Sequence, residues 1–195
     1  MTAGHDLVVV GASWGGLDAI GTLLGGLPAA LDATIVVAQH RSPGSHPTAF
    51  RDLLRKATLL RVREPDDKAP LERGVVFVAP PDYHVYVEGD HLTLSTDVRV
   101  AYSRPSINVL FQSSGESFRD RCVGVVLTGA NEDGADGLRV IADLGGAALV
   151  QDPATAARAE MPAAALAAVP GATVLPVEQI PAALVELCGV AKVVA

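Results

Sequence analysis

Short runs of consecutive apolar residues alternate along the chain with longer stretches whose apolar residues recur at helical spacing. The apolar runs predict buried β-strands at 7–10, 34–39, 74–79, 122–127 and 147–150. The helical spacing predicts helices at about 15–24, between Pro47 and Lys56, and at 105–119, 136–144, 153–168 and 177–188. Strands that are apolar at every position and are separated by helices are typical of a parallel sheet covered on both faces. We therefore predict an α/β fold with a doubly wound, mostly parallel sheet and helices on both faces.

One segment departs from this pattern. Residues 84–94 (HVYVEGDHLTL) alternate between apolar and polar positions around a central Gly89-Asp90 pair, which predicts a small antiparallel hairpin. No internal repeat, low-complexity linker or change of composition divides the chain. We therefore expect residues 1–195 to form a single domain.

Charge and composition argue against nucleic-acid-binding, membrane-spanning and secreted proteins. The formal net charge is −7 and no run is rich in lysine or arginine, which argues against nucleic-acid binding. No apolar run approaches the roughly 18 residues of a membrane helix, and the first six residues do not resemble a secretory signal. Cys122 and Cys188 lack metal-ligand spacing and are expected to be reduced thiols. We expect a cytoplasmic protein with no membrane insertion, no metal and no cofactor.

The first apolar run ends in the glycine-rich stretch GASWGG, residues 11–16. A phosphate-binding loop would place Lys and Ser or Thr where Leu17 and Asp18 stand. A dinucleotide-binding turn would place glycine where Ser13 stands. The stretch does match G-x-S-x-G, the pattern of a serine nucleophile on a strand-to-helix turn, where the first N–H groups of the helix can stabilise an oxyanion. A helix N-cap is the alternative role for Ser13.

A serine nucleophile needs a base, and His40 is the best-placed histidine. It directly follows the run 34–39, so it is expected at the carboxyl edge of the sheet, facing Ser13 across the crevice where ligands bind in such folds. No histidine follows residue 91, which excludes the α/β-hydrolase fold, where the histidine comes last. The remaining histidines are expected at the opposite edge of the sheet (His5) or on the solvated surface (His46, His84 and His91).

The third member of a triad should be a carboxylate that orients the imidazole. Residues 123–137 form another apolar run that ends in a glycine-rich acidic loop, with Glu132, Asp133 and Asp136 available. Gly134 next to Asp133 allows a tight turn, whereas Asp136 can instead supply negative charge to a helix N-terminus. Candidates for all three members of a triad therefore follow three separate strands. This common position favours the role of nucleophile over that of N-cap for Ser13.

Over nearly its full length the chain resembles the catalytic domain of the CheB protein-glutamate methylesterases. The resemblance is carried by VVVGASWGG, VVAQH and VVLTGANEDGADGL, with support from GVVFVAPPDYH, RPSINVLFQSS and QDPATAARAEMPAAAL. It implies that Ser13 is the nucleophile, His40 the general base and Asp133 its orienting carboxylate. It also implies that the backbone N–H groups of Trp14 and Ala130 form the oxyanion hole.

The implied activity is hydrolysis of glutamyl methyl esters on chemoreceptor helices or related sensory proteins, with release of methanol and deamidation of particular glutamines. The family has a small residue where Trp14 stands and Met-Gly where Ala130-Asn131 stand, departures that bear on substrate choice. Two alternatives stay open: a non-catalytic docking or adaptor module of a sensory complex, and a nucleotide-binding module.

Two further expectations concern regulation and binding. Typical family members carry an N-terminal receiver domain, whereas this sequence begins six residues before its first strand. We therefore expect a site open to solvent, not gated in cis by phosphorylation, with control from expression, a separate receiver protein or access to the substrate helix. Arg41, Arg104 and Arg158 are expected to form a basic patch for an acidic receptor helix.

Overall fold

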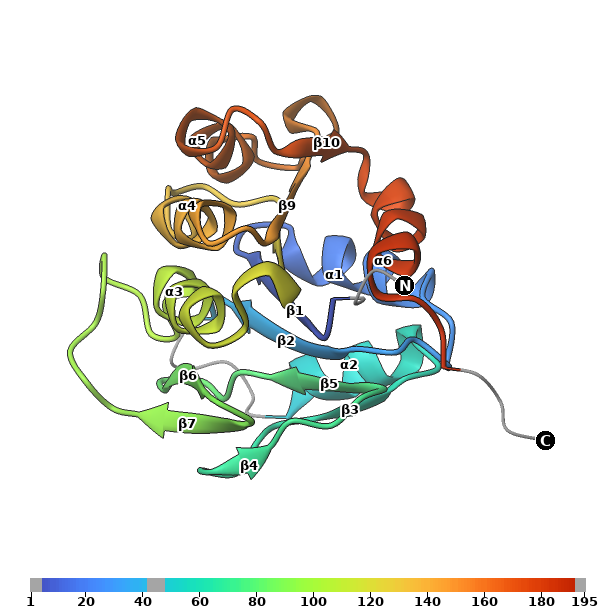
Figure 1. The fold of residues 1–195 in the computed structure, drawn as a ribbon. Helices are drawn as coiled ribbons and strands as arrows, with labels where there is room; N and C mark the ends of the chain where they lie inside the picture. Colours follow the sequence, from blue (N-terminus) through green and yellow to red (C-terminus); the bar gives the residue numbers. More distant parts are fainter. Residues whose placement is uncertain (1–4, 42–47, 192–195) are drawn as a thin grey trace.

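A parallel sheet forms the central layer of the protein (Figure 1). The computed structural model describes residues 5–41 and 48–191. Within these residues seven strands pair in the order β10-β9-β8-β1-β2-β5-β3, and each neighbouring pair is parallel. Their bounds are β1 (Leu7–Ala12), β2 (Thr34–Gln39), β3 (Arg61–Arg63), β5 (Val75–Val78), β8 (Cys122–Val126), β9 (Ala147–Gln151) and β10 (Thr173–Leu175).

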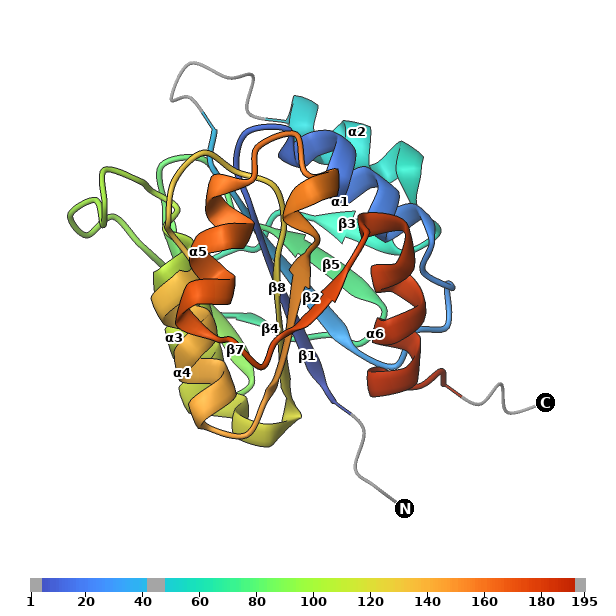
Figure 2. The same cartoon turned by 90° about the horizontal axis from the view of Figure 1, so that it is seen from above.

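Helices cover both faces of this sheet (Figures 1 and 2). One face carries α1 (Gly16–Gly25), α2 (Ala49–Ala57) and α6 (Ile180–Cys188), and the other carries α3 (Ile107–Phe118), α4 (Ala135–Asp143) and α5 (Glu160–Ala168). Successive β1 side chains belong to different cores, since Val8 packs with the first set of helices and Val9 with the second. This two-sided burial explains why the central strands are apolar at every position, and it confirms the doubly wound α/β prediction.

A small antiparallel sheet adjoins the main sheet below α3 in Figure 1. The predicted hairpin is confirmed as β6 (His84–Glu88) and β7 (His91–Ser95), and the short strand β4 (Ala69–Pro70) pairs with β7. The sequence pattern did not predict β3, β4 or β10. These strands are two or three residues long, which is too short for a recognisable period.

Three predicted helices begin later than expected. The segment predicted at 177–188 is a 3-10 turn, Val177–Gln179, followed by α6 from Ile180. The segment predicted at 153–168 is a short 3-10 turn, Pro153–Thr155, followed by α5 from Glu160. The helix α3 begins at Ile107 rather than Pro105, because Ser106 is its N-cap and accepts a hydrogen bond from the Val109 N–H.

The order of the strands creates a switch point at β1. The chain passes from β1 to β2 on one side and later returns to β8 on the other side. The carboxyl ends of these three strands therefore lie together, where doubly wound folds place their ligand crevice. Among the described residues, none of the helices is both long and apolar enough to cross a membrane.

Candidate active site

Ser13 lies in the turn that connects β1 with α1. Its N–H donates to the Thr128 carbonyl at 2.9 Å, and its carbonyl accepts from the Gly16 N–H at 2.9 Å. Gly15, with φ +76°, is the N-cap of α1 and adopts the left-handed conformation that favours glycine. The N-cap hypothesis for Ser13 is therefore wrong, and its hydroxyl does not cap the first turn of α1.

His40 follows β2 directly and lies beside Ser13. The two strands are in register with Ala12 opposite Gln39, and the His40 N–H donates to the Ala12 carbonyl at 3.2 Å. The Gln39 side chain fixes both turns, because its Nε2 donates to the Ser13 carbonyl at 2.7 Å and to the His40 carbonyl at 2.9 Å. The candidate nucleophile and base are thus held by one buried amide.

His40 and Asp133 are in direct contact. His40 Nε2 lies 2.8 Å from Asp133 Oδ2, and only 13% of the imidazole is exposed. Asp133 Oδ2 also accepts the Ile107 N–H at 2.7 Å, while Oδ1 accepts the Asn108 N–H at 3.0 Å and the Ser106 hydroxyl at 2.9 Å. The start of α3 therefore surrounds the carboxylate with donors at the positive end of the helix dipole.

These donors keep Asp133 ionised. Burial by itself would raise the pKa of its carboxyl, but hydrogen bonds from His40 and from the N–H groups of Asn108 and Ile107 outweigh burial and lower the pKa. An anionic Asp133 can orient the imidazole and stabilise its cation. Asp133 binds Nε2 here, so Nδ1 is the nitrogen left to receive a proton, which reverses the roles of the two nitrogens in the chymotrypsin-type triad.

The other two candidate carboxylates lie elsewhere. Glu132 is exposed. Asp136 is 79% exposed in the first turn of α4, with its Oδ1 3.5 Å from Arg139 Nη2. Of the three acidic residues of this loop, Asp133 is the one that contacts His40.

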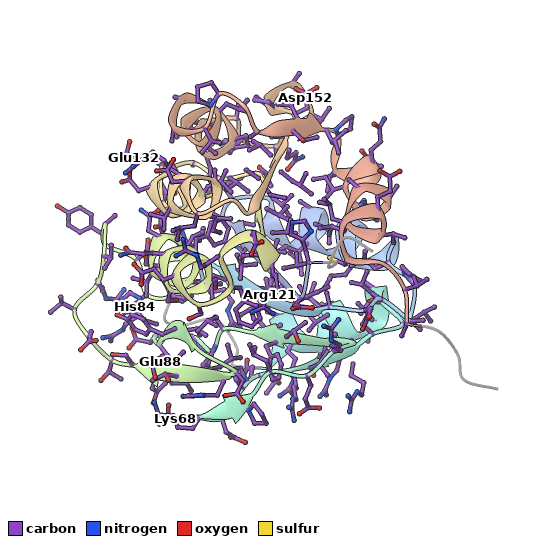
Figure 3. The ribbon with its side chains drawn as sticks, in the orientation of Figure 1. Lys68, His84, Glu88, Arg121, Glu132 and Asp152 are labelled. Atoms are coloured by element: carbon purple, nitrogen blue, oxygen red, sulfur yellow. The ribbon has the colours of Figure 1, made fainter. Side chains whose placement is uncertain are left out.

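A buried histidine, His84, supports the start of α3. His84 is 0% exposed, its Nδ1 accepts the Ser106 N–H at 3.2 Å, and its Nε2 lies 3.1 Å from the Val98 carbonyl. It stands at the start of β6, next to α3 (Figure 3). The expectation that His84 is solvated is therefore wrong, because α3 covers the small sheet here. His46 lies outside the described residues.

The predicted oxyanion donors lie in two loops that are tied together. In the part of the chain that the structure describes, the N–H groups of Trp14 and Ala130 donate to no protein acceptor. The Thr128 hydroxyl donates to the Trp14 carbonyl at 2.9 Å and accepts the Arg158 N–H at 2.9 Å. Both backbone groups are thus available to a developing oxyanion.

The predicted basic patch is wrong for two of its three arginines. The Arg41 side chain is 6% exposed, with Nη2 2.6 Å from the Ala79 carbonyl. The Arg104 side chain is 16% exposed, with Nη2 3.0 Å from Asp82 Oδ2. Arg158 is half exposed and places its guanidinium 5.6 Å from the centre of the Trp14 ring, which is itself 66% exposed. Arg158 and Trp14 form the exposed rim of the site.

Sequence reasoning missed several residues that hold the site together. Ser106 carried a signal, since a serine before an apolar helical run is a typical N-cap. Gln39, His84 and Asn108 carried none, because their partners are distant in sequence. Asn131 was noted only as a departure from the family, yet its Nδ2 lies 3.3 Å from His40 Nδ1.

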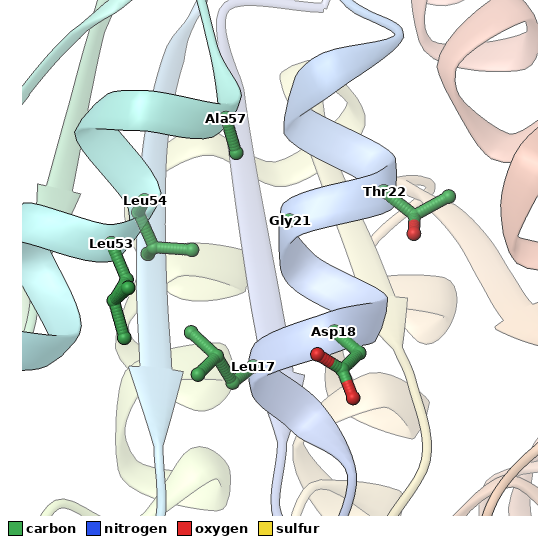
Figure 4. Close-up of a pocket in the computed structure, with 7 residues that line it drawn as sticks. All are labelled: Leu17, Asp18, Gly21, Thr22, Leu53, Leu54 and Ala57. Carbon is green, nitrogen blue, oxygen red and sulfur yellow. The ribbon is translucent and has the colours of Figure 1, made fainter.

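Among the described residues no group of three or more His, Cys, Asp or Glu side chains could hold a metal ion. A crevice of about 430 Å³ lies between α1 and α2, and one of its lining residues, Leu17, comes four residues after Ser13 (Figure 4). The residues that line it are Leu17, Asp18, Gly21, Thr22, Leu53, Leu54 and Ala57.

Solved structures include a clear match to this fold. The crystal structure of the Thermotoga maritima CheB methylesterase catalytic domain superimposes with a TM-score of 0.89 at 27% sequence identity. The match covers 96% of this chain and 100% of that domain.

Named relatives match in sequence. A protein-glutamate methylesterase/protein-glutamine glutaminase of Anaeromyxobacter dehalogenans is 42% identical over 182 residues, which cover 93% of this chain and 53% of that protein. A Leptospira interrogans protein that carries the same name in provisional form is 41% identical, with 94% of this chain and 95% of that protein covered. The family model described as CheB methylesterase matches residues 8–184. The chain therefore belongs to the CheB methylesterase family.

Proposed function

We propose that the chain is a serine esterase that hydrolyses glutamyl methyl esters on chemoreceptors or related sensory proteins and releases methanol. The observation that carries the proposal is the contact between His40 and the buried, ionised Asp133, beside the glycine-flanked turn of Ser13. The names of the relatives supply the substrate class, a glutamyl ester or a glutamine side chain in a protein. We propose that residues 1–195 act as a single catalytic domain.

In the proposed reaction Ser13 Oγ attacks the ester carbonyl while His40 Nδ1 takes the hydroxyl proton. The N–H groups of Trp14 and Ala130 stabilise the oxyanion. The tetrahedral intermediate collapses, the C–O bond to the methoxy group breaks, and His40 returns its proton to form methanol. Water then attacks the acyl-enzyme by the same route and leaves a glutamate carboxylate.

The same residues can deamidate glutamine. Ser13 adds to the side-chain amide, and the proton held by His40 goes to the departing nitrogen, which leaves as ammonia. Both reactions end in the same acyl-enzyme and need no group beyond this chain and water.

The decisive experiment measures methanol released from a methylated chemoreceptor fragment by the purified chain. We expect turnover by the wild type and a loss of several orders of magnitude in Ser13→Ala and in His40→Ala, with thermal unfolding little changed. Binding of the fragment without methanol release would instead support the adaptor alternative. Titration with nucleotides tests the nucleotide-binding alternative, for which we expect no binding.

A further inference from the structure

Asn131 contacts His40 on the side of the imidazole opposite to Asp133. Its Nδ2 lies 3.3 Å from His40 Nδ1, and its Oδ1 accepts the Asp133 N–H at 3.2 Å. A backbone N–H can only donate, so the amide atom that faces it must be the oxygen. The Asn131 amide is therefore oriented with its NH₂ group toward the imidazole.

The two neighbours of His40 select the same protonation state. An NH₂ group has only protons to offer, so the nitrogen it faces, Nδ1, must carry a lone pair. The proton is then on Nε2, which donates to Asp133 Oδ2 at 2.8 Å. The buried carboxylate already requires this tautomer, so Asn131 is not needed to select it. Any effect of Asn131 on the reaction must therefore come from its hydrogen bond to the lone pair of His40 Nδ1.

We propose that Asn131 caps the lone pair of the general base and so slows the activation of Ser13 until a substrate draws the amide away. The inference rests on the proposed function, in which Nδ1 takes the Ser13 proton. Within the described residues the Ser13 hydroxyl makes no hydrogen bond, whereas the Asn131 amide occupies Nδ1. Asn131 is thus a positioning residue that acts through His40.

The cap opposes the first chemical step. An imidazole nitrogen has a single lone pair in the ring plane, so the amide and the serine hydroxyl compete for it. Once Nδ1 takes the proton it becomes a donor, and the Asn131 NH₂ group then faces another donor. The contact therefore stabilises the resting imidazole and not the cation that forms in the transition state.

The Asn131 cap also gives a reason for selectivity between polypeptide substrates and small esters. A protein substrate has backbone carbonyls beside the ester, and one of them can accept the Asn131 NH₂ group and so replace Nδ1 as its partner. A small ester without such a carbonyl has no substitute to offer. Asn131 therefore restrains reaction with small esters more than reaction with a polypeptide.

The test measures how fast a small fluorophosphonate labels Ser13, followed by intact mass. In this reaction a serine–phosphorus bond forms, the phosphorus–fluorine bond breaks, fluoride leaves and His40 takes the proton. We expect Asn131→Ala to be labelled about two- to tenfold faster than wild type, the range set by loss of one hydrogen bond. Glu132→Ala, an exposed neighbour in the same loop, should be labelled at the wild-type rate.

Asn131→Asp separates the cap from a general effect on the loop. It keeps an acceptor for the Asp133 N–H but presents an acceptor to Nδ1, which favours a proton there. We expect slower labelling than wild type, because a protonated Nδ1 cannot accept the Ser13 proton. The ¹⁵N shift of His40 Nδ1 should also move toward that of an unbonded, unprotonated nitrogen in Asn131→Ala.

The outcomes separate the cap from the function on which it rests. If the wild type is labelled at Ser13 but Asn131→Ala reacts at the same rate or more slowly, the cap is overturned and the proposed function stands. If Ser13 is not labelled in any variant, the proposed function fails and the cap fails with it. Faster labelling of Asn131→Ala without the nitrogen shift change would also overturn the cap.

Discussion

His40 Nε2 donates to Asp133 Oδ2 over 2.8 Å, and the carboxylate that accepts this hydrogen bond is completely shielded from solvent. The two residues are 93 positions apart in the sequence. They meet because β2 and β8 both neighbour β1, so the loops that follow them reach across the same strand end. The start of α3 completes the environment by supplying N–H donors to the carboxylate.

Asp133→Asn should nearly abolish esterase activity. An asparagine can present an NH₂ group to His40 and so favour the wrong tautomer, and the corresponding change in a serine protease lowers kcat by about 10⁴. Turnover of a methylated receptor fragment is the measurement. Asp136→Asn is the matched control, because Asp136 is exposed and pairs with Arg139, and it should keep near-normal turnover. The reverse result would move the orienting role to Asp136.

The stability that Asp133 supplies should depend on pH. Its pKa in the folded protein is lowered by its hydrogen bonds despite burial, below the value of about 3.9 of an unfolded aspartate. Its contribution is therefore complete above about pH 4 and is lost as the pH falls through the lower folded pKa. Urea unfolding of wild type and Asp133→Asn should show a difference that is constant near neutrality and shrinks below pH 4. A difference that grew on acidification would contradict the assignment.

His84→Ala should weaken the site without touching the substrate. The change leaves the buried Ser106 N–H without its acceptor, and an unsatisfied buried group costs about 1–3 kcal/mol. We expect a lower free energy of unfolding and a lower kcat, because Ser106 also donates to Asp133. His91→Ala, on the partly exposed strand β7 of the hairpin, is the control and should change neither quantity. Equal effects of the two substitutions would argue against a role for the His84 contact.

Gly134→Ala should lower the stability of the protein and disturb the loop that carries Asp133. Gly134 has φ +105°, and a Cβ there would lie 2.7 Å from Ile107 Cγ2. Strain at such a position costs about 1–3 kcal/mol, and here it also displaces the Asp133 loop from α3. Gly171→Ala has open space around the new Cβ and should leave stability nearly unchanged. Thermal unfolding and turnover of both variants test the comparison.

Arg158→Glu should weaken the binding of an acidic receptor helix. Arg158 is half exposed and lies over the exposed Trp14 ring at the rim of the site, where charge reversal acts on binding more than on chemistry. We expect a several-fold increase in KM that diminishes at high salt, with kcat little changed. Arg139→Glu, equally exposed on α4, is the control. An unchanged KM at low ionic strength would exclude Arg158 from substrate binding.

The α/β architecture and the position of three candidate residues at the carboxyl edge of the sheet follow from local patterns in the sequence. Runs such as 34–39 are apolar at every position because both faces of the strand are buried, and this pattern is local. The alternation of strands and helices then places every strand-to-helix loop at the same edge. Ser13, His40 and Asp133 could therefore be assigned to that edge without knowledge of the order of the strands.

The contacts that hold these residues in place depend on packing between distant segments and could not be read from the sequence. Hydropathy periodicity reports which face of an element is buried but not which distant element buries it. The His84–Ser106 contact, the donors of α3 around Asp133 and the Asn131 amide on His40 each join segments that meet only after the sheet has assembled. The same limit explains the error on Arg41 and Arg104. From the sequence alone, a charged residue in a loop is expected to be exposed to solvent. The side chains of Arg41 and Arg104 are instead mostly buried because packing brings acceptors to them, the Ala79 carbonyl and Asp82.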